Sequence, residues 1–367
     1  MRSNRTVLSL LLIAGAAVMS LWTSPSLADS PTEVTPLPVV ISPSNHLIRY
    51  VGRFDTSESS GPRCSWSASE VELRFRGSAL NVSLADTSSS DEFQVVVDGS
   101  PSSVITTNNP SGLYNVYSGT NDAVHTIQLV KRTEAFFGVA QFQGFQLSTG
   151  GKLLPLPKPS NRRIEVIGDS ISCGYGDLAP NQEAHFSATT EDAYLSYGAV
   201  AARALHAQYV CIAWSGRLMW PTNTMSSVYG MTLPTVSGSK WNFKTWIPQA
   251  VIINLSTNDF APGVPAAKPW EKGYEAFIAR VRKHYPHALI YCASSPMLWG
   301  NNSTISREYI HQIVTDEHNS GDNRVHYMDF QTQLESNGFG ADWHPNVKTH
   351  AIMAAVVEQD LKRDLGW

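Results

Sequence analysis

Four residues suited to ester chemistry follow four separate apolar runs of this sequence, namely Ser170, Gly216, Asn258 and His344. A serine hydroxyl attacks a carbonyl once a base removes its proton, and a histidine has the pKa for that task. The tetrahedral intermediate needs N–H donors around its oxyanion, each typically worth about 3 kcal/mol. The backbone amides of Ser170 and Gly216 and the side-chain amide of Asn258 can supply them. The spacing therefore predicts a serine nucleophile, a histidine base and an oxyanion hole.

The setting of Ser170 favours this interpretation. The residue ends the tripeptide Gly168-Asp169-Ser170, which follows the apolar run 164–167. A serine on a turn between a strand and a helix is where an α/β fold exposes a nucleophile, and the N–H groups at the helix start stabilise an anion. Alone, the tripeptide also suits an ordinary loop in which Ser170 caps a helix and Asp169 holds the turn. The presence of Gly216, Asn258 and His344 later in the chain favours the interpretation of Ser170 as the nucleophile.

The group that orients the base stays open between two alternatives. A carboxylate or a carbonyl must hold the imidazole in the tautomer whose other nitrogen accepts the serine proton. Asp342, two residues before His344, is the carboxylate candidate, and a backbone carbonyl is the other. His350 is the nearest rival histidine, but it lies within the final helical pattern, and we interpret it as structural.

Tryptophans gather in the second half of the chain, where eight of the ten lie at position 214 or beyond. Trp343 adjoins His344, and an exposed indole there would stack on a sugar ring. Trp214 and Trp299 also follow predicted strands. We expect these three residues to contact substrate.

The second half of the chain alternates apolar strands with helical patterns. The predicted strands are Ile164–Ile167, Tyr209–Ala213, Ala250–Leu255, Ala288–Ala293 and Val325–Asp329. Continuous apolar strands separated by helices predict an α/β domain with a five-stranded parallel sheet covered on both faces. Ligands of such folds bind beyond the carboxyl ends of the strands, which is where the four candidate residues lie.

The first half has a different rhythm, with alternating runs at 70–77, 93–99 and 125–132. Asp98-Gly99 is typical of a tight hairpin. Short strands with polar turns and no helical pattern predict an antiparallel β-sandwich of jelly-roll type.

We therefore divide the chain into four segments. Residues 1–28 have a charged start, an apolar stretch and small residues at the end, which predicts a signal peptide that is cleaved. The β-sandwich is expected over 31–150, a proline-rich linker over 151–161 and the α/β domain over 162–367. An exported protein that is secreted or periplasmic, with no membrane attachment after cleavage, follows from this division.

Composition limits the partners. The chain has 367 residues, is 42% hydrophobic and carries a formal charge of −4, so no basic surface for nucleic acid is indicated. The four cysteines lack metal-ligand spacing and are expected to be buried thiols, with one disulfide pair left open. We expect no metal, no organic cofactor and a monomer.

Longer motifs give these residues a family context. Residues 161–367 resemble an SGNH (GDSL-type) hydrolase, whose name lists the Ser, Gly, Asn and His described above. The segments 125–138, 168–176 and 342–346 resemble carbohydrate esterase family 2. That resemblance implies a jelly roll before a flavodoxin-like SGNH domain. It also implies removal of O-acetyl groups from plant polysaccharides such as xylan and glucomannan.

Two residues depart from the SGNH pattern. Ser256 stands where a Gly-x-Asn-Asp motif would begin, and Ala341 stands three residues before the histidine, where such enzymes commonly place an acid. The resembling family tolerates a serine–histidine dyad with a backbone carbonyl on the ring, so the choice between Asp342 and a carbonyl stays open.

Three functions remain to be separated. The first is an exported esterase that deacetylates xylan- or glucomannan-type polysaccharide or oligosaccharide. The second uses the same mechanism on envelope glycans or small acyl esters. The third is a carbohydrate-binding protein whose hydrolase domain is inert.

Overall fold

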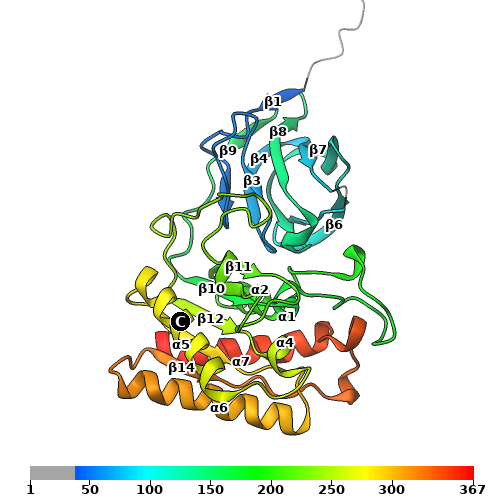
Figure 1. Cartoon of the computed structure of the whole chain (residues 1–367). Coiled ribbons are helices and arrows are strands. Elements are labelled where there is room, and N and C mark those ends of the chain that lie inside the picture. The colour runs from blue at the N-terminus through cyan, green and yellow to red at the C-terminus, as the bar shows by residue number, and fades with distance from the viewer. Residues whose placement is uncertain (1–37, 89) are drawn as a thin grey trace, which may run out of the picture. The chain divides into compact units, whose positions relative to one another are not determined.

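The N-terminal part of the chain is an antiparallel sheet of nine strands in the described residues (Figure 1). The computed structural model describes residues 38–88 and 90–367. The predicted signal peptide, residues 1–28, lies outside the described residues. The strands are β1 (Val39–Ile41), β2 (Arg49–Val51), β3 (Arg63–Cys64), β4 (Glu70–Asp86), β5 (Glu92–Val97), β6 (Ser100–Thr106), β7 (Ser111–Lys131), β8 (Ala140–Leu147) and β9 (Lys152–Leu154).

Two long strands organise this domain. The path of the sheet is β1-β8-β4-β7-β5-β6, with β2 and β9 on β4 and β3 on β8. Alternate side chains of β4, such as Val71, Leu73 and Phe75, are fully buried, as a half-buried strand requires. The strands predicted over 70–77 and 125–132 are longer in the structure. Bulges near Gly77 let β4 bend while its pairing with β7 continues.

The predicted linker over 151–161 is wrong at its start. Residues Lys152–Leu154 form β9, in which Leu154 pairs with Arg74 of β4. Pro155 follows directly and has no N–H to donate to a sheet, which ends the strand. The connection between the two domains therefore begins after Leu154.

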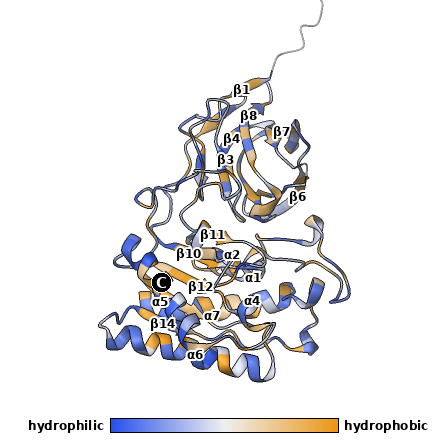
Figure 2. Cartoon of the chain, viewed as in Figure 1, coloured by the Kyte–Doolittle hydropathy of each residue, from blue (hydrophilic) through white to orange (hydrophobic). Residues whose placement is uncertain are grey.

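The C-terminal part is the predicted five-stranded parallel sheet, in the order β11-β10-β12-β13-β14. Its strands are β10 (Arg163–Gly168), β11 (Gln208–Ala213), β12 (Ala250–Asn254), β13 (Leu289–Ala293) and β14 (Val325–Met328). Every residue of β12 is buried, as expected for a strand covered on both faces. In Figure 2, β12 is largely hydrophobic, whereas α6 carries hydrophilic residues along its length.

Helices cover both faces of this sheet. The long helices are α2 (Tyr197–Ala204), α5 (Ala267–His284), α6 (Gly300–Asn319) and α7 (Val347–Leu365). Residues of α2 and α7 share one apolar core with the sheet, and residues of α5 and α6 share another. The short helices are α1 (Ser170–Cys173), α3 (Met225–Val228) and α4 (Thr257–Phe260), with 3-10 turns at Ala135–Phe137, Ala188–Thr190, Glu335–Asn337 and Ala341–Trp343.

Buried polar contacts join the N-terminal domain to the C-terminal domain. Arg53 of the N-terminal domain is fully buried, and its guanidinium donates to the carbonyls of Tyr229 and Met231. The same group lies 3.5 Å from the Glu165 carboxylate on β10. The described residues, 38–88 and 90–367, accordingly belong to one compact unit.

The cysteines behave as expected from their lack of spacing. All four, Cys64, Cys173, Cys211 and Cys292, are buried and form no disulfide. Among the helices in the described ranges, none has the length and apolar character needed to cross a bilayer.

Candidate active site

Ser170 and His344 meet at the carboxyl edge of the parallel sheet. Ser170 begins α1 directly after β10, and Asp169 caps that helix by accepting the Ile171 N–H over 3.1 Å. The Ser170 Oγ lies 2.9 Å from His344 Nε2. This is the contact that a nucleophile and its general base require.

A backbone carbonyl holds the other side of the imidazole. His344 Nδ1 lies 3.0 Å from the Ala341 carbonyl oxygen. Because a carbonyl only accepts hydrogen bonds, the proton belongs on Nδ1, and Nε2 is left as an acceptor facing Ser170. The base is therefore held in the tautomer that removes a proton from serine.

Of the two alternatives for the group that orients His344, the contacts favour the Ala341 carbonyl over the Asp342 carboxylate. The Asp342 carboxylate accepts from the Tyr175 hydroxyl at 2.9 Å and the Phe186 N–H at 3.2 Å, and its other oxygen lies 3.0 Å from His185 Nδ1. The reason is backbone geometry: Asp342 has φ 49° and ψ 41°, a left-handed conformation that turns its side chain away from His344.

The turn that contains Ala341 is held by its neighbours. The Ala341 N–H donates to the Gly176 carbonyl over 2.9 Å. Gly176 has φ +59°, and a side chain on it would meet the Ala341 methyl at 2.3 Å, so only glycine allows this approach. The glycine of the 168–176 motif thus serves the placement of His344.

Burial tunes the base. His344 is partly buried, and the Tyr175 ring stacks on it with centroids 4.1 Å apart. Burial lowers the pKa of His344 to about 4, while the hydrogen bond to Ala341 acts in the opposite direction. The imidazole is therefore neutral, and able to accept a proton, above that pH.

Two of the predicted oxyanion donors are unengaged. Within residues 90–367, no atom accepts a hydrogen bond from the backbone N–H of Ser170 or of Gly216. Gly216 has φ +74°, which favours glycine at the turn after β11. The third, Asn258, lies on α4 and donates from Nδ2 to the Arg217 carbonyl at 3.1 Å and, at 3.4 Å, to Asp169.

The departure at Ser256 is tolerated by the backbone. Ser256 has φ 178°, extended backbone that any residue adopts, so the missing glycine is not needed for the turn before Asn258. The Ser256 carbonyl accepts from the N–H groups of Asp259 and Phe260 and starts α4.

Two of the three predicted tryptophans line an open cavity. Trp343 and Trp299 expose 55% and 50% of their surface, whereas Trp214 is only partly exposed beneath the Arg217 guanidinium, 4.2 Å from its ring. The cavity has a volume of about 520 Å³ and is lined by Met297, Trp299, Glu335, Phe339 and Trp343. Trp343 directly precedes His344, so this aromatic surface adjoins the base.

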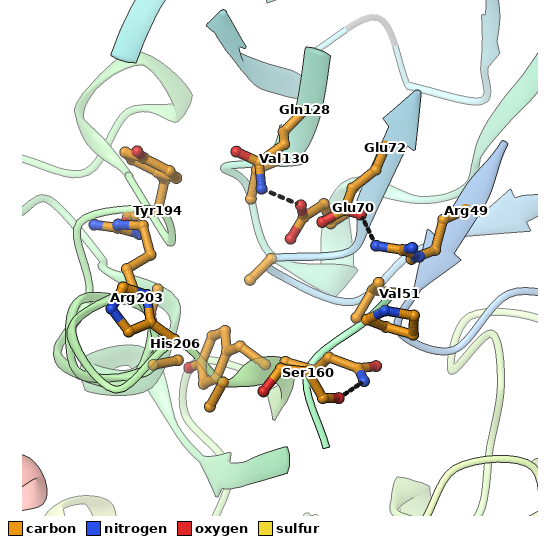
Figure 3. A pocket seen from close by; sticks show the side chains of 17 residues that line it. Arg49, Val51, Glu70, Glu72, Gln128, Val130, Ser160, Tyr194, Arg203 and His206 are labelled. Atoms are coloured by element: carbon orange, nitrogen blue, oxygen red, sulfur yellow. Dashed lines mark hydrogen bonds and ion pairs between the residues drawn. The ribbon is translucent and has the colours of Figure 1, made fainter. Parts of the chain in front are cut away.

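A second cavity lies at the opposite edge of the parallel sheet, and Figure 3 shows the side chains around it. Ser160 and Gln208, which line it, lie at the amino ends of β10 and β11. Glu70 also lines it and accepts a hydrogen bond from Gln128 at 2.6 Å. None of the predicted site residues lines this cavity.

Sequence reasoning missed two residues that contact the site. Tyr175 stacks on the base, and Glu134 accepts from Ser215, beside Gly216. Both lie in the motifs 125–138 and 168–176, so the motifs contained them without revealing their contacts.

The match to known families follows the two-domain order. One sequence model, described as Carbohydrate esterase 2 N-terminal, matches residues 50–157. A second, the GDSL-like Lipase/Acylhydrolase family, matches residues 166–352. The chain belongs to carbohydrate esterase family 2. Its enzyme class is that of the carboxylic ester hydrolases.

Curated relatives of this family 2 chain differ in how much of their length it covers. It is 40% identical to Cellulase/esterase CelE of Acetivibrio thermocellus over 326 residues, which cover 87% of this chain and 40% of that protein. It is 26% identical over 337 residues to an acetylxylan esterase / glucomannan deacetylase of Cellvibrio japonicus, covering 89% of this chain and 91% of that protein. The chain thus spans less than half of the first relative.

Solved family 2 structures match the fold. A family two carbohydrate esterase from Clostridium thermocellum, in complex with cellohexaose, superimposes with a TM-score of 0.85 at 40% identity. That match covers 87% of this chain and 99% of the other.

Proposed function

We propose that this chain is an exported serine esterase that removes O-acetyl groups from polysaccharides of the acetylated xylan or glucomannan type. The observation that carries the proposal is the ordered contact from Ser170 Oγ to His344 Nε2, with His344 Nδ1 on the Ala341 carbonyl. That arrangement is a serine–histidine dyad ready for acyl transfer.

The reaction proceeds in two halves. Ser170 Oγ attacks the acetyl carbonyl carbon while His344 Nε2 takes its proton. The N–H groups of Ser170 and Gly216 stabilise the oxyanion, and the Asn258 amide joins them by giving up its 3.4 Å contact with Asp169. The sugar oxygen then leaves with the proton from His344. Water, deprotonated by the same nitrogen, attacks the acyl-enzyme and releases acetate.

The substrate class is supported by the aromatic surface beside the base. Trp343 and Trp299 are half exposed around a common cavity, and an indole face suits the apolar face of a sugar ring. Trp214 is a weaker contact because Arg217 covers it. Relatives named as acetylxylan esterase / glucomannan deacetylase point to the same class of substrate.

We also propose where the enzyme acts and how its two domains work together. Residues 1–28 act as a signal peptide, so that the mature enzyme works outside the cytoplasm. The β-sandwich over 31–150 and the hydrolase domain over 162–367 act as one monomeric enzyme without a cofactor.

The test is acetate release by the purified mature protein and its Ser170→Ala variant. Acetylated xylan, acetylated glucomannan and acetylated peptidoglycan serve as substrates. We expect turnover of the plant-type polysaccharides and a loss of at least about 10⁴-fold in Ser170→Ala. Preference for peptidoglycan would reassign the substrate. Binding of glycan without any turnover by the parent enzyme would reject the esterase.

A further inference from the structure

The loop that carries Gly216 is held from outside its own domain. Glu134 follows β7 of the N-terminal domain and is fully buried. The Ser215 backbone N–H donates to Glu134 Oε2 over 2.6 Å, and the Ser215 hydroxyl donates to Oε1. The carbonyl of Ser215 and the N–H of Gly216 belong to the same peptide bond. The two hydrogen bonds to Glu134 therefore hold the residue directly before the Gly216 N–H.

Gly216 is held on its carbonyl side, where its oxygen accepts a hydrogen bond from Asn223 Nδ2 over 3.1 Å. A side chain on it would find no atom within 4 Å, so nothing packs against this side of the residue. Its N–H has no acceptor in the portion of the chain that the structure describes. The Asn223 bond acts on the peptide that follows Gly216. The direction of the Gly216 N–H therefore depends on the peptide before it, where the two Ser215 bonds act.

The same carboxylate contacts the nucleophile's helix. The Cys173 thiol, on α1, lies 3.9 Å from Glu134 Oε2 and donates to it. Helix α1 begins with Ser170, whose N–H is the other backbone donor. One buried carboxylate thus touches both backbone segments that face the oxyanion.

Glu134 is anchored from behind. Its own N–H donates to Glu191 Oε2 over 3.0 Å. The Lys131 ammonium donates to the Glu134 carbonyl at 3.3 Å and to the Thr133 carbonyl at 3.0 Å. Lys131 is in turn paired with the buried Asp91. The carboxylate therefore has a fixed support on which to hold Ser215.

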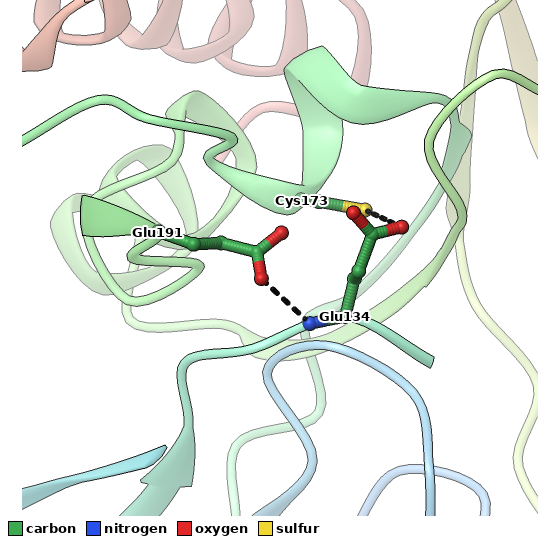
Figure 4. A group of neighbouring side chains, drawn as sticks. All are labelled: Glu134, Cys173 and Glu191. Carbon is green, nitrogen blue, oxygen red and sulfur yellow. Dashed lines mark hydrogen bonds between the residues drawn. The ribbon is translucent and has the colours of Figure 1, made fainter. Parts of the chain in front are cut away.

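Glu134, Cys173 and Glu191 also form the cluster of Figure 4, whose potential ligand atoms lie within 4.8 Å of one another. A metal ion fits this cluster poorly, because both Glu134 oxygens accept from Ser215 and burial raises the pKa of the Cys173 thiol well above its ordinary value. Burial and the neighbouring Glu134 charge raise the pKa of Glu191 as well. The hydrogen bonds, in which both Glu134 oxygens accept from Ser215, assign the acceptor role to Glu134.

We propose that Glu134 is a positioning residue of the oxyanion hole: by accepting both Ser215 hydrogen bonds, it aims the Gly216 N–H at the oxyanion beside Ser170. The N-terminal β-domain thereby supplies part of the catalytic geometry. This inference rests on the proposed serine esterase mechanism.

The test compares Glu134→Ala and Glu134→Gln on a chromogenic acetate ester, which reports the mechanism whatever the natural glycan. Glu134→Ala removes both acceptors, and we expect kcat to fall roughly 10²-fold with KM changed less than about threefold. Glu134→Gln keeps a carbonyl for the Ser215 N–H and an amide that donates to its hydroxyl. The kcat of Glu134→Gln should therefore be at least about tenfold higher than that of Glu134→Ala.

A matched control separates positioning from general destabilisation. Glu92 is a buried carboxylate of the same domain, 3.0 Å from Arg132, with no contact to Ser215. Glu92→Ala should lower the melting temperature as Glu134→Ala does, yet keep kcat within a few-fold. Equal losses of kcat in the two alanine variants would overturn the inference.

A smaller change decides the matter if Glu134→Ala does not fold. Ser215→Ala removes the hydroxyl bond and keeps the N–H bond, and a fall of about tenfold in kcat is expected. Parent kcat in that variant would overturn the inference. If Ser170→Ala retains parent activity, the esterase mechanism fails instead, which is a distinct result.

Discussion

His344 and Gly216 belong to the same proposed site around Ser170 and are held in different ways. The turn 341–344 places its histidine with a carbonyl from three residues away, and its nearby Asp342 carboxylate binds Tyr175 and Phe186. The loop 214–217 is held by a carboxylate from another domain, 81 residues away along the chain. A carboxylate close in sequence to the base does not touch it, while a distant one supports the oxyanion side.

The two carboxylates, Asp342 and Glu134, differ in how deeply they are buried, and this difference affects which hydrogen-bond donors each one needs. Asp342 is partly exposed, and its hydrogen bond with His185 is the largest of the causes that lower its pKa. Glu134 is buried, and burial raises its pKa. A buried carboxylate must find donors, and the Ser215 N–H and hydroxyl are the donors within reach.

The largest expected effect tests the oxyanion side. Asn258→Ala removes an amide donor, and we expect kcat on acetylated xylan to fall about 10²- to 10³-fold. Steady-state kinetics measure this. Asn302→Ala is the matched control, since Asn302 donates to the Phe260 carbonyl at 2.8 Å, at the end of the same helix. Unchanged kcat in Asn258→Ala would remove Asn258 from the oxyanion hole.

The next effect concerns the base. Because burial lowers the pKa of His344 to about 4, kcat/KM should rise with pH through that value and level off above it. At pH values below the pKa of His344, kcat/KM should fall about tenfold for each unit by which the pH is lowered. A pH–rate profile on a small ester, corrected for acid unfolding, measures the limb. A limb above pH 6 would contradict the burial argument.

A smaller effect is expected at Asp342. If a carboxylate oriented the base, replacing it by an amide would cost roughly 10⁴-fold in kcat. Because the Ala341 carbonyl has that role here, Asp342→Asn should cost less than about tenfold. A loss near 10⁴-fold would restore the carboxylate triad. Melting temperatures of both proteins control for damage to the turn.

The smallest effect on catalysis is expected at Glu70, a partly buried carboxylate with no contact to the site. Burial and the neighbouring Glu72 raise its pKa from 4.5 to about 8. Between those values the unfolded chain releases a proton that the folded protein keeps, so stability falls as pH rises. Glu70→Gln should therefore melt higher than the parent at pH 8, with little difference at pH 4 and unchanged kcat. Identical melting curves at pH 8 would contradict this.

Much of this arrangement could be predicted from local sequence patterns. The five parallel strands are continuous apolar runs, and Ser170 and His344 lie at the expected edge of their sheet. The strand β9 was missed because three residues show no periodicity, and the nearby prolines favoured a linker.

The orientation of the base could not be predicted from sequence alone. Both Asp342 and Trp343 have positive φ, at 49° and 65°. Few residues other than glycine adopt that conformation, and although aspartate is enriched among them, its presence alone does not predict it. The role of Glu134 depends on contacts across two domains, which spacing along the chain does not encode.

The buried Arg53, which bonds carbonyls of the hydrolase domain and faces Glu165, has a consequence for how such enzymes are recombined. If the domains were separated, Arg53 would lose its partners in the hydrolase domain, and Glu165 would lose its cation. Gene fusions that swap binding modules or linkers around this enzyme should therefore carry residues 38–367 as one indivisible cassette.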